Sequence, residues 1–213
     1  MMANKQILGL IICLFVVASG FISCESDEKI TQEPPSDEYL EKAKEILNGD
    51  IVLSTKATLN GVDKTLLETG CPTMFNFSWR NDGKMVLTLK DFTVGKMPMV
   101  ITFRCATTVM QLNSWEKDEY TGAGWIKFQG KDGNVTTVGE NAADNMEGSG
   151  ARVDGYLNVN TQQIEFIVDY NVMIVRSECF LQTIDKTRIN RFEEEFEQFE
   201  KDLQKKKEEL GIG

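Results

Sequence analysis

The side chain that most often serves as a general base or a metal ligand is missing from this sequence. The chain contains no His, and His is both a frequent general base and the most common metal ligand. Ser-His-Asp triads, Cys-His pairs and His-ligated zinc sites are therefore excluded. Cys71, Cys105 and Cys179 lie far apart in the chain, without the close spacing of a metal site or a base to activate a thiol. We predict no catalytic residue, no metal site and no cofactor.

The same cysteines are odd in number, so at most one disulfide can form among them. Cys105 and Cys179 fall inside predicted strands and could face each other as a pair. Small buried hydrophobic side chains are the preferred interpretation, because free Cys is among the most buried residue types. Cys71 precedes Pro72 in a predicted loop, and the sequence leaves the disulfide state open.

Carboxylates could supply an acid and a base without His. A glycosidase needs two of them on opposite sides of a cleft, and no pair stands out in the sequence. Glu140, Asp144 and Glu147 gather in the Gly-rich run GENAADNMEGSG, whose oxygen ligands could hold calcium. The run does not match the EF-hand pattern. We expect a solvated loop there that could act as a gate.

Aromatic side chains offer a different chemistry, the stacking of flat rings on a sugar or an apolar ligand. Trp115 and Tyr120 bracket the charged run 116–119, which places two rings beside polar groups. They are the candidate ligand-binding residues. The alternative is that both rings anchor the ends of a strand connection. Trp79 and Trp125 lie in predicted strands, where we expect them to belong to the core.

Composition limits the class of fold and of partner. The 213 residues are 41% hydrophobic and 26% charged, which is typical of a globular domain. The formal net charge is -10, whereas a nucleic-acid surface needs clustered Lys and Arg to neutralise phosphates. We therefore expect no nucleic-acid partner.

The N-terminus carries an export pattern. Lys5 precedes the apolar run 7–19, as in the charged and hydrophobic regions of a secretory signal. A membrane-spanning helix is the alternative, but it needs about 20 apolar residues. The residues FIS before Cys24 resemble the lipobox of bacterial lipoproteins. The resemblance implies a signal peptide over residues 1–23 and a lipid on Cys24 that anchors the chain in a membrane.

The segment that follows Cys24 is acidic and polar. Its start, ESDE at 25–28, resembles the export signal that sends lipoproteins of Bacteroidota to the outer face of the outer membrane. This resemblance implies a surface-exposed outer-membrane lipoprotein, with a periplasm-facing one as the alternative. Residues 24–35 are mostly polar and include Pro34-Pro35, so we expect them to form a tether.

A short helix is predicted after the tether. Ser36 is a suitable N-cap, acidic residues follow it in the first turn, and Asn48-Gly49 is a fitting end. The apolar residues between them share one helical face: Tyr39, Leu40, Ala43, Ile46 and Leu47. We expect this helix to plug or flank a β core.

From Asp50 to Ile184 the apolar residues alternate with polar ones at period two. Phe75, Phe77 and Trp79 show this alternation, and Asn81-Asp82-Gly83 turns the chain into the next strand of a hairpin. The whole region predicts eight or nine antiparallel strands. Such strands must close as a barrel or stack as a sandwich, because both arrangements hide the apolar face.

The last segment returns to helical spacing, which predicts a long helix over residues 186–210. Its apolar stripe comprises Ile189, Phe192, Phe196, Phe199, Leu203 and Leu210. Packing of this stripe on the same domain is the preferred interpretation. The alternative is that Phe192, Phe196, Phe199 and Leu203 dock a partner protein or a second copy of the chain.

The lipobox, the acidic tether, the meander of about eight strands and the terminal helix together resemble the calycin-like (lipocalin-like barrel) lipoproteins of gut Bacteroidota. The resemblance implies a single, mainly β domain over residues 36–213, with a barrel preferred to a sandwich. No lipocalin Gly-x-Trp signature lies near the first strand, so no binding residue is carried over. A barrel of this size is filled by its own side chains or holds one small ligand.

The function that we expect is a non-catalytic binding module for a small apolar or glycan ligand. The alternative is a structural or accessory lipoprotein that works through its C-terminal helix.

Overall fold

The computed structural model describes residues 33–93, 100–138, 148–171 and 174–212. The predicted signal peptide, Cys24 and most of the predicted tether lie outside these residues. The same is true of Glu140, Asp144 and Glu147, which the sequence places in a predicted Gly-rich loop. Among the described residues, the buried core extends from Ala43 to Leu203.

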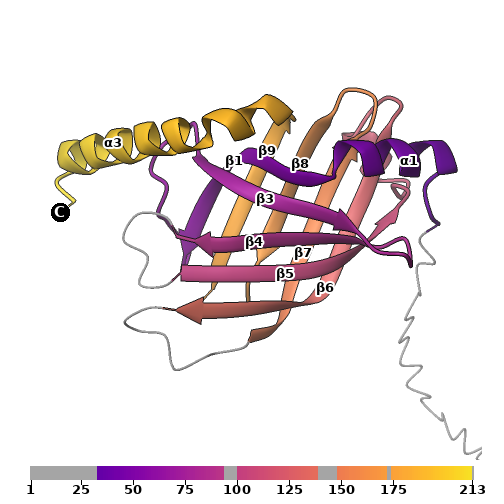
Figure 1. The fold of residues 1–213 in the computed structure, drawn as a ribbon, viewed down its shortest axis with the longest axis horizontal. Helices are drawn as coiled ribbons and strands as arrows, with labels where there is room; N and C mark the ends of the chain where they lie inside the picture. The colour runs from indigo at the N-terminus through magenta and orange to yellow at the C-terminus, as the bar shows by residue number, and fades with distance from the viewer. Residues whose placement is uncertain (1–32, 94–99, 139–147, 172–173, 213) are drawn as a thin grey trace, which may run out of the picture. The chain divides into compact units, whose positions relative to one another are not determined.

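Strands make up most of the regular structure (Figure 1). The helical elements are α1 (Asp37–Ile46), the single turn α2 (Glu116–Glu119), the 3-10 helix η1 (Lys186–Arg191) and the long α3 (Phe192–Leu210). The strands are β1 (Gly49–Leu59), β2 (Val62–Asp63), β3 (Cys71–Trp79), β4 (Met85–Phe92), β5 (Val100–Met110), β6 (Trp125–Val138), β7 (Gly148–Asn158), β8 (Gln163–Asp169) and β9 (Val175–Thr183).

The strands form one antiparallel sheet that closes on itself. Neighbours follow chain order from β3 to β9, and β1 pairs both with β3 and with β9. The closing ladder runs from Thr55 opposite Cys179 to Leu59 opposite Val175. Among the described strands β2 pairs with β1 alone, so the other eight of the nine strands form the barrel. This confirms the predicted barrel and excludes the sandwich.

Inward side chains fill the barrel. Phe75 and Phe77 of β3 are fully buried and alternate with outward Asn76 and Ser78, as the period of a strand requires. Phe166 of β8 packs edge-on against Phe75, with ring centroids 5.0 Å apart. The interior is a packed core whose largest fully buried side chains include Phe75, Phe77, Phe103, Phe128 and Tyr170.

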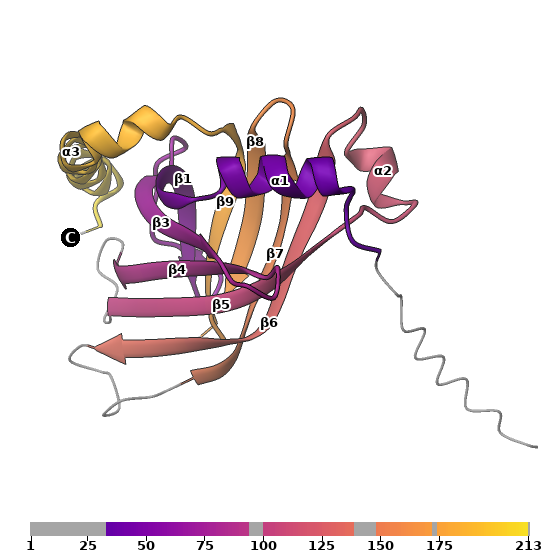
Figure 2. The ribbon, with the colours of Figure 1, turned by 45° about the vertical axis from the view of Figure 1, so that its right-hand side comes forward.

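The helix α1 lies across one end of the barrel (Figure 2). The Ser36 hydroxyl caps it by accepting a hydrogen bond from the backbone N–H of Tyr39 at 3.3 Å, as predicted. The indole N–H of Trp79 donates to the Leu47 carbonyl at 2.7 Å and ties the end of α1 to β3. The helix and its C-cap residue thereby add three buried side chains to the core: Ala43, Ile46 and Leu47.

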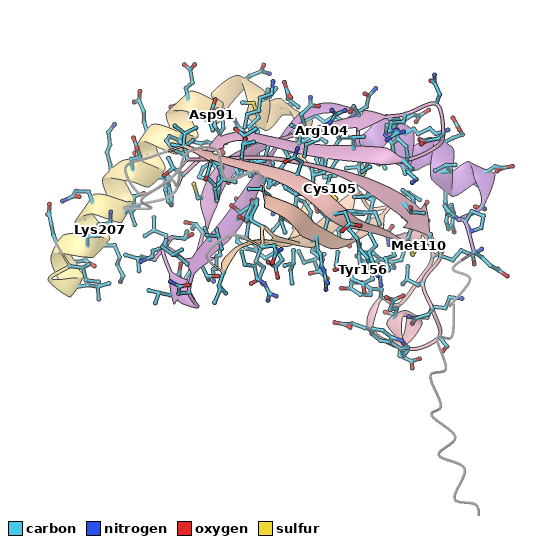
Figure 3. All side chains as sticks on the ribbon, turned by 90° about the horizontal axis from the view of Figure 1, so that it is seen from below. Asp91, Arg104, Cys105, Met110, Tyr156 and Lys207 are labelled. Atoms are coloured by element: carbon cyan, nitrogen blue, oxygen red, sulfur yellow. The ribbon has the colours of Figure 1, made fainter. Side chains whose placement is uncertain are left out.

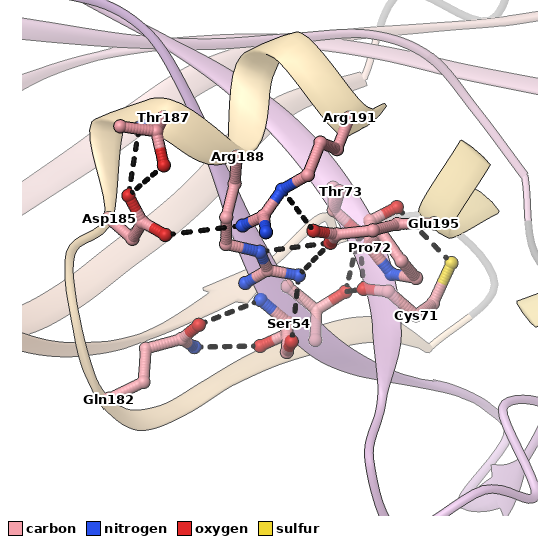
Figure 4. Close-up of polar contacts among 11 residues, drawn as sticks. Ser54, Cys71, Pro72, Thr73, Gln182, Asp185, Thr187, Arg188, Arg191 and Glu195 are labelled. Atoms are coloured by element: carbon pink, nitrogen blue, oxygen red, sulfur yellow. Dashed lines mark hydrogen bonds and ion pairs between the residues drawn. The ribbon is translucent and has the colours of Figure 1, made fainter. Parts of the chain in front are cut away.

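Polar contacts fasten η1 and the start of α3 to β1 (Figure 4). Glu195 accepts hydrogen bonds from Arg188 Nε at 3.0 Å and Arg188 Nη2 at 2.7 Å. Arg188 Nη2 also reaches the Ser54 hydroxyl at 3.3 Å. The predicted C-terminal helix is confirmed, with its first six residues in 3-10 form.

Gln182 supports the same junction. The side-chain amide of Gln182 donates to the Ser54 carbonyl at 3.0 Å and accepts from the Ser54 N–H at 2.9 Å. The ladder between β1 and β9 begins only at Thr55. The Gln182 side chain therefore satisfies the backbone groups of Ser54 in place of a strand neighbour.

Candidate functional site

The single turn α2 is folded onto the outer wall of the barrel beside β6. Asn113 Oδ1 accepts a hydrogen bond from the Glu116 N–H, and Glu116 Oε2 accepts one from the Asn113 N–H, both at 2.9 Å. This reciprocal pairing has the form of a capping box. The strand pattern predicts no helix here, although the spacing of Asn113 and Glu116 is a signal that could have found it.

Glu116 is a fully buried carboxylate, with 0% of its surface exposed. Its Oε1 accepts hydrogen bonds from Lys127 Nζ at 2.6 Å and from the Tyr156 hydroxyl at 2.9 Å. Burial alone would raise the pKa of Glu116. The hydrogen bonds from Lys127, the Asn113 backbone and Tyr156 outweigh it and lower that pKa. Glu116 is therefore ionised at neutral pH and holds α2 against the wall.

Tyr120 ends α2 and is fixed by side chains of the barrel wall. Its ring stacks on Tyr156, with centroids 4.0 Å apart and planes 20° apart. Its hydroxyl donates a hydrogen bond to Glu165 on β8. Burial and the neighbouring carboxylates raise the pKa of Tyr120 and of Tyr156 above the ordinary range. Both phenols are therefore neutral hydrogen-bond donors at physiological pH.

A groove opens beside Tyr120, between α1, α2 and the start of β6. Its volume is about 410 Å³, which is in the range of small-ligand sites. The rings of Tyr120 and Trp125 lie 4.9 Å apart between centroids, at 57°. We call this site the aromatic groove, after the three rings that line it: Tyr39 from α1, Tyr120 from α2 and Trp125 from β6.

Polar groups complete the aromatic groove. Gln111 and Lys117 line it together with the chain that leads into α1. The Gln111 N–H donates to the Glu33 carbonyl and its side-chain amide donates to the Pro34 carbonyl, both at 2.9 Å. The end of the predicted tether is thus fixed at the edge of the groove. The groove offers aromatic faces beside hydrogen-bonding groups, and such a surface can bind a sugar.

The structure separates the two residues that the sequence proposes for ligand binding. Tyr120 lines the aromatic groove, whereas Trp115 is 63% exposed and is not among the lining residues. The assignment of Trp125 to the core is wrong. Ile126 and Phe128 point inward, so Trp125 and Lys127 point outward from β6. The sequence shows the same alternation, because Ile126 and Phe128 are apolar residues two positions apart and Trp125 is out of step with them.

The cysteines do not form a reactive site. Cys71, Cys105 and Cys179 are free and buried, which agrees with the preferred interpretation of Cys105 and Cys179. The loop predicted at Cys71 is wrong, because Cys71 is the first residue of β3 and pairs with Thr55 of β1. Burial raises the pKa of Cys71 to about 12, that of Cys105 to about 11, and that of Cys179 as well. The thiols are protonated at neutral pH. In the described ranges, no group of three or more His, Cys, Asp or Glu side chains could hold a metal ion.

The apolar stripe of α3 turns toward its own barrel. Phe199 and Leu203 are only 6% and 4% exposed and belong to the core. Phe192 and Phe196 are half-buried and line a second, larger groove. The preferred interpretation, packing of the stripe on the same domain, is therefore confirmed for Phe199 and Leu203. Docking of a partner through this helix stays a prediction.

Comparisons with known proteins identify a family for this chain, but they assign no activity to it. A family model described as "Domain of unknown function (DUF4903)" matches residues 24–211. No curated protein and no solved structure matches the chain. Among the residues that the structure describes, no helix is long and apolar enough to cross a membrane.

Proposed function

The chain belongs to the family described as domain of unknown function DUF4903, and we propose that it is a non-catalytic protein that binds a glycan in the aromatic groove. One observation carries the proposal. Tyr39, Tyr120 and Trp125 come from three different elements and line a single groove that is open to solvent. Rings collected in this way form a binding surface more readily than a core.

The chemistry of the aromatic groove suits a sugar. A sugar ring has an apolar face that stacks on an aromatic ring and a rim of hydroxyls that need hydrogen-bond partners. Lys117 lines the groove and has no ion-pair partner among the described residues. Tyr120 is already held by Tyr156 and Glu165. Binding would therefore cost little ordering of this ring.

The proposal includes a lipid anchor on Cys24. The lipobox-like residues before Cys24 and the acidic run after it support an outer-membrane lipoprotein that faces outward, similar to the calycin-like lipoproteins of gut Bacteroidota. A periplasm-facing protein is the alternative. Nine residues lead from Cys24 to Glu33, and they span at most about 30 Å. A lipid on Cys24 would keep the aromatic groove within that distance of the membrane surface.

The test is binding of the chain from Ser26 to Gly213 to an array of immobilised oligosaccharides, preceded by native mass spectrometry to detect any copurified glycan. Trp125→Ala should weaken the binding of any glycan found by about 5- to 10-fold, the effect of losing about 1 kcal/mol of ring contact. Trp115→Ala is the matched control, because Trp115 lies outside the groove. Equal losses in the two variants, or no glycan bound by the wild type, would refute the proposal.

The other candidate function, docking of a partner through α3, has weaker support. Two of its four proposed contact residues, Phe199 and Leu203, are already buried against the barrel. A partner would reach only the half-buried Phe192 and Phe196 without unfolding this contact.

A further inference from the structure

A second groove lies on the outer wall of the barrel under the start of α3. Its volume is about 860 Å³, and none of its lining residues lines the aromatic groove. Figure 3 shows Arg104 of this groove and Tyr156, which contacts Glu116 and Tyr120, on separate parts of the wall. We call it the outer groove.

The floor of the outer groove is a row of polar side chains across four strands. Asp50 is paired with Asn76, Asn76 with Thr88, and Thr88 with Arg104. All four line the groove, and they alternate along their strands with buried inward residues. Neighbouring strands lie about 4.8 Å apart. The row is therefore about 14 Å wide, with a carboxylate at one end and a guanidinium at the other.

The wall of the outer groove is aromatic and held firmly. Phe192 and Phe196 of α3 lie 5.9 Å apart between ring centroids. The contacts of Arg188 with Glu195 and Ser54 fix this turn of the helix on β1 (Figure 4). Because α3 packs against β3, the rings stand beside the strand that lies two positions from Arg104.

The charged residues of the outer groove differ in whether they have a hydrogen-bond partner. Asp50 accepts a hydrogen bond from Asn76 Nδ2 at 2.7 Å. Arg104 and Lys90 have neither an ion pair nor a side-chain hydrogen bond with any described residue. Asp91 is the remaining charged residue of the lining, and it lies next to Lys90 in the chain. The β5 end of the floor thus carries a cation that no described residue pairs with, and this cation can bind an anion.

We propose that the outer groove binds an amphiphilic anion. The acidic group of the ligand contacts Arg104, with Lys90 nearby, and its apolar body lies on Phe192 and Phe196. Two strand spacings between β3 and β5 set the length of that body at about 10 Å. A guanidinium binds a carboxylate, sulfonate or phosphate oxygen through charge-assisted hydrogen bonds. The inference is independent of the proposed glycan function, because the two sites share no residue.

The experiment is a fluorescence titration of the chain from Ser26 to Gly213 with 1-anilinonaphthalene-8-sulfonate, which joins an apolar body to one sulfonate. We expect saturable binding at one site. Arg104→Gln should raise the dissociation constant about tenfold, because a hydrogen bond to a charged group is lost. Arg176→Gln is the matched control, since Arg176 is an exposed arginine on β9 outside the groove. Its dissociation constant should stay that of the wild type.

A second variant and a second ligand pair test the apolar wall. Phe192→Ser should weaken binding of the same probe, because Phe192 is half-buried and lines the groove without belonging to the core cluster. Decanoate should displace the probe and decanol should not. The proposal is overturned if Arg104→Gln and Arg176→Gln bind the probe alike, or if decanol competes as well as decanoate. Failure of glycan binding would leave this result unchanged.

Discussion

At the level of single residues, Glu116 shows how a buried charge is stabilised on the outer wall of the barrel. Removing a carboxylate from water costs several kcal/mol unless hydrogen bonds and an opposite charge compensate it. Lys127, Tyr156 and the Asn113 backbone provide three such donors. The Tyr156 ring also stacks on the ring of Tyr120. The Glu116 carboxylate therefore indirectly positions Tyr120, which forms one face of the aromatic groove.

Lys127→Met tests this arrangement. The substitution leaves the buried carboxylate of Glu116 without its countercharge, and we expect the free energy of unfolding to fall by about 3 kcal/mol. Urea unfolding of the chain from Ser26 measures it. The double variant Glu116→Leu with Lys127→Met should regain most of the loss, because no charge is then buried. A double variant no more stable than Lys127→Met alone would contradict this account.

The lowered pKa of Glu116 also predicts how stability depends on pH. A group whose pKa is lower in the folded chain contributes stability above its unfolded value, about 4.3 for Glu, and loses it as the pH falls. Glu116→Gln removes this titration. The unfolding free energy of the wild type should therefore fall more steeply between pH 7 and pH 3 than that of Glu116→Gln. Parallel curves in urea unfolding over that range would show that Glu116 is not the group responsible.

At the level of elements, α3 is part of the fold. Phe199→Ala should lower the free energy of unfolding by about 3 kcal/mol, because it empties a buried aromatic site against the barrel. Glu197→Ala is the control on the same helix, since Glu197 is exposed, and it should change stability by less than about 0.5 kcal/mol. Guanidinium unfolding compares the two. If α3 served only a partner, Phe199→Ala would leave stability unchanged.

Elements with a local signal could be predicted from the sequence. The alternation of Phe75, Phe77 and Trp79 before a turn led to the hairpin of β3 and β4, with Trp79 opposite Met85. The sequence favours a barrel, but the strand pair that closes it could not be predicted, because this pairing joins Thr55 to Cys179 across most of the chain. Alternation says which face of a strand is buried and nothing about its partner at the far edge.

The aromatic groove likewise has features that the sequence could predict and features that it could not. Tyr120 was found as an aromatic residue in a polar connection, and the outward phase of Trp125 could have been found from its neighbours. The contacts that hold Tyr120 could not. They depend on the register that sets Lys127 opposite Tyr156 and Tyr156 opposite Glu165. No local pattern fixes that register across three strands.

At the level of the whole molecule, the filled barrel explains why both proposed binding sites lie outside its interior. An eight-stranded barrel has room for its own side chains or for one small ligand. Here Phe166 lies among Phe75, Phe77 and Phe128, with ring centroids 5.0, 6.4 and 5.9 Å away. Gly155 permits this packing, because a Cβ there would come within 2.3 Å of the Phe128 ring. Both grooves lie outside this core.

Phe166→Leu separates an interior ligand from an outer one. The smaller side chain loses edge-on ring contacts and leaves a void, so the free energy of unfolding should fall by about 1 to 2 kcal/mol. The dissociation constants for 1-anilinonaphthalene-8-sulfonate and for any glycan found should stay within about twofold, since a change of that size is below about 0.5 kcal/mol. Trp125→Ala should do the reverse for the glycan and weaken binding with little effect on stability. For a ligand inside the barrel, Phe166→Leu would change the dissociation constant and Trp125→Ala would not. That outcome would place the binding site in the core.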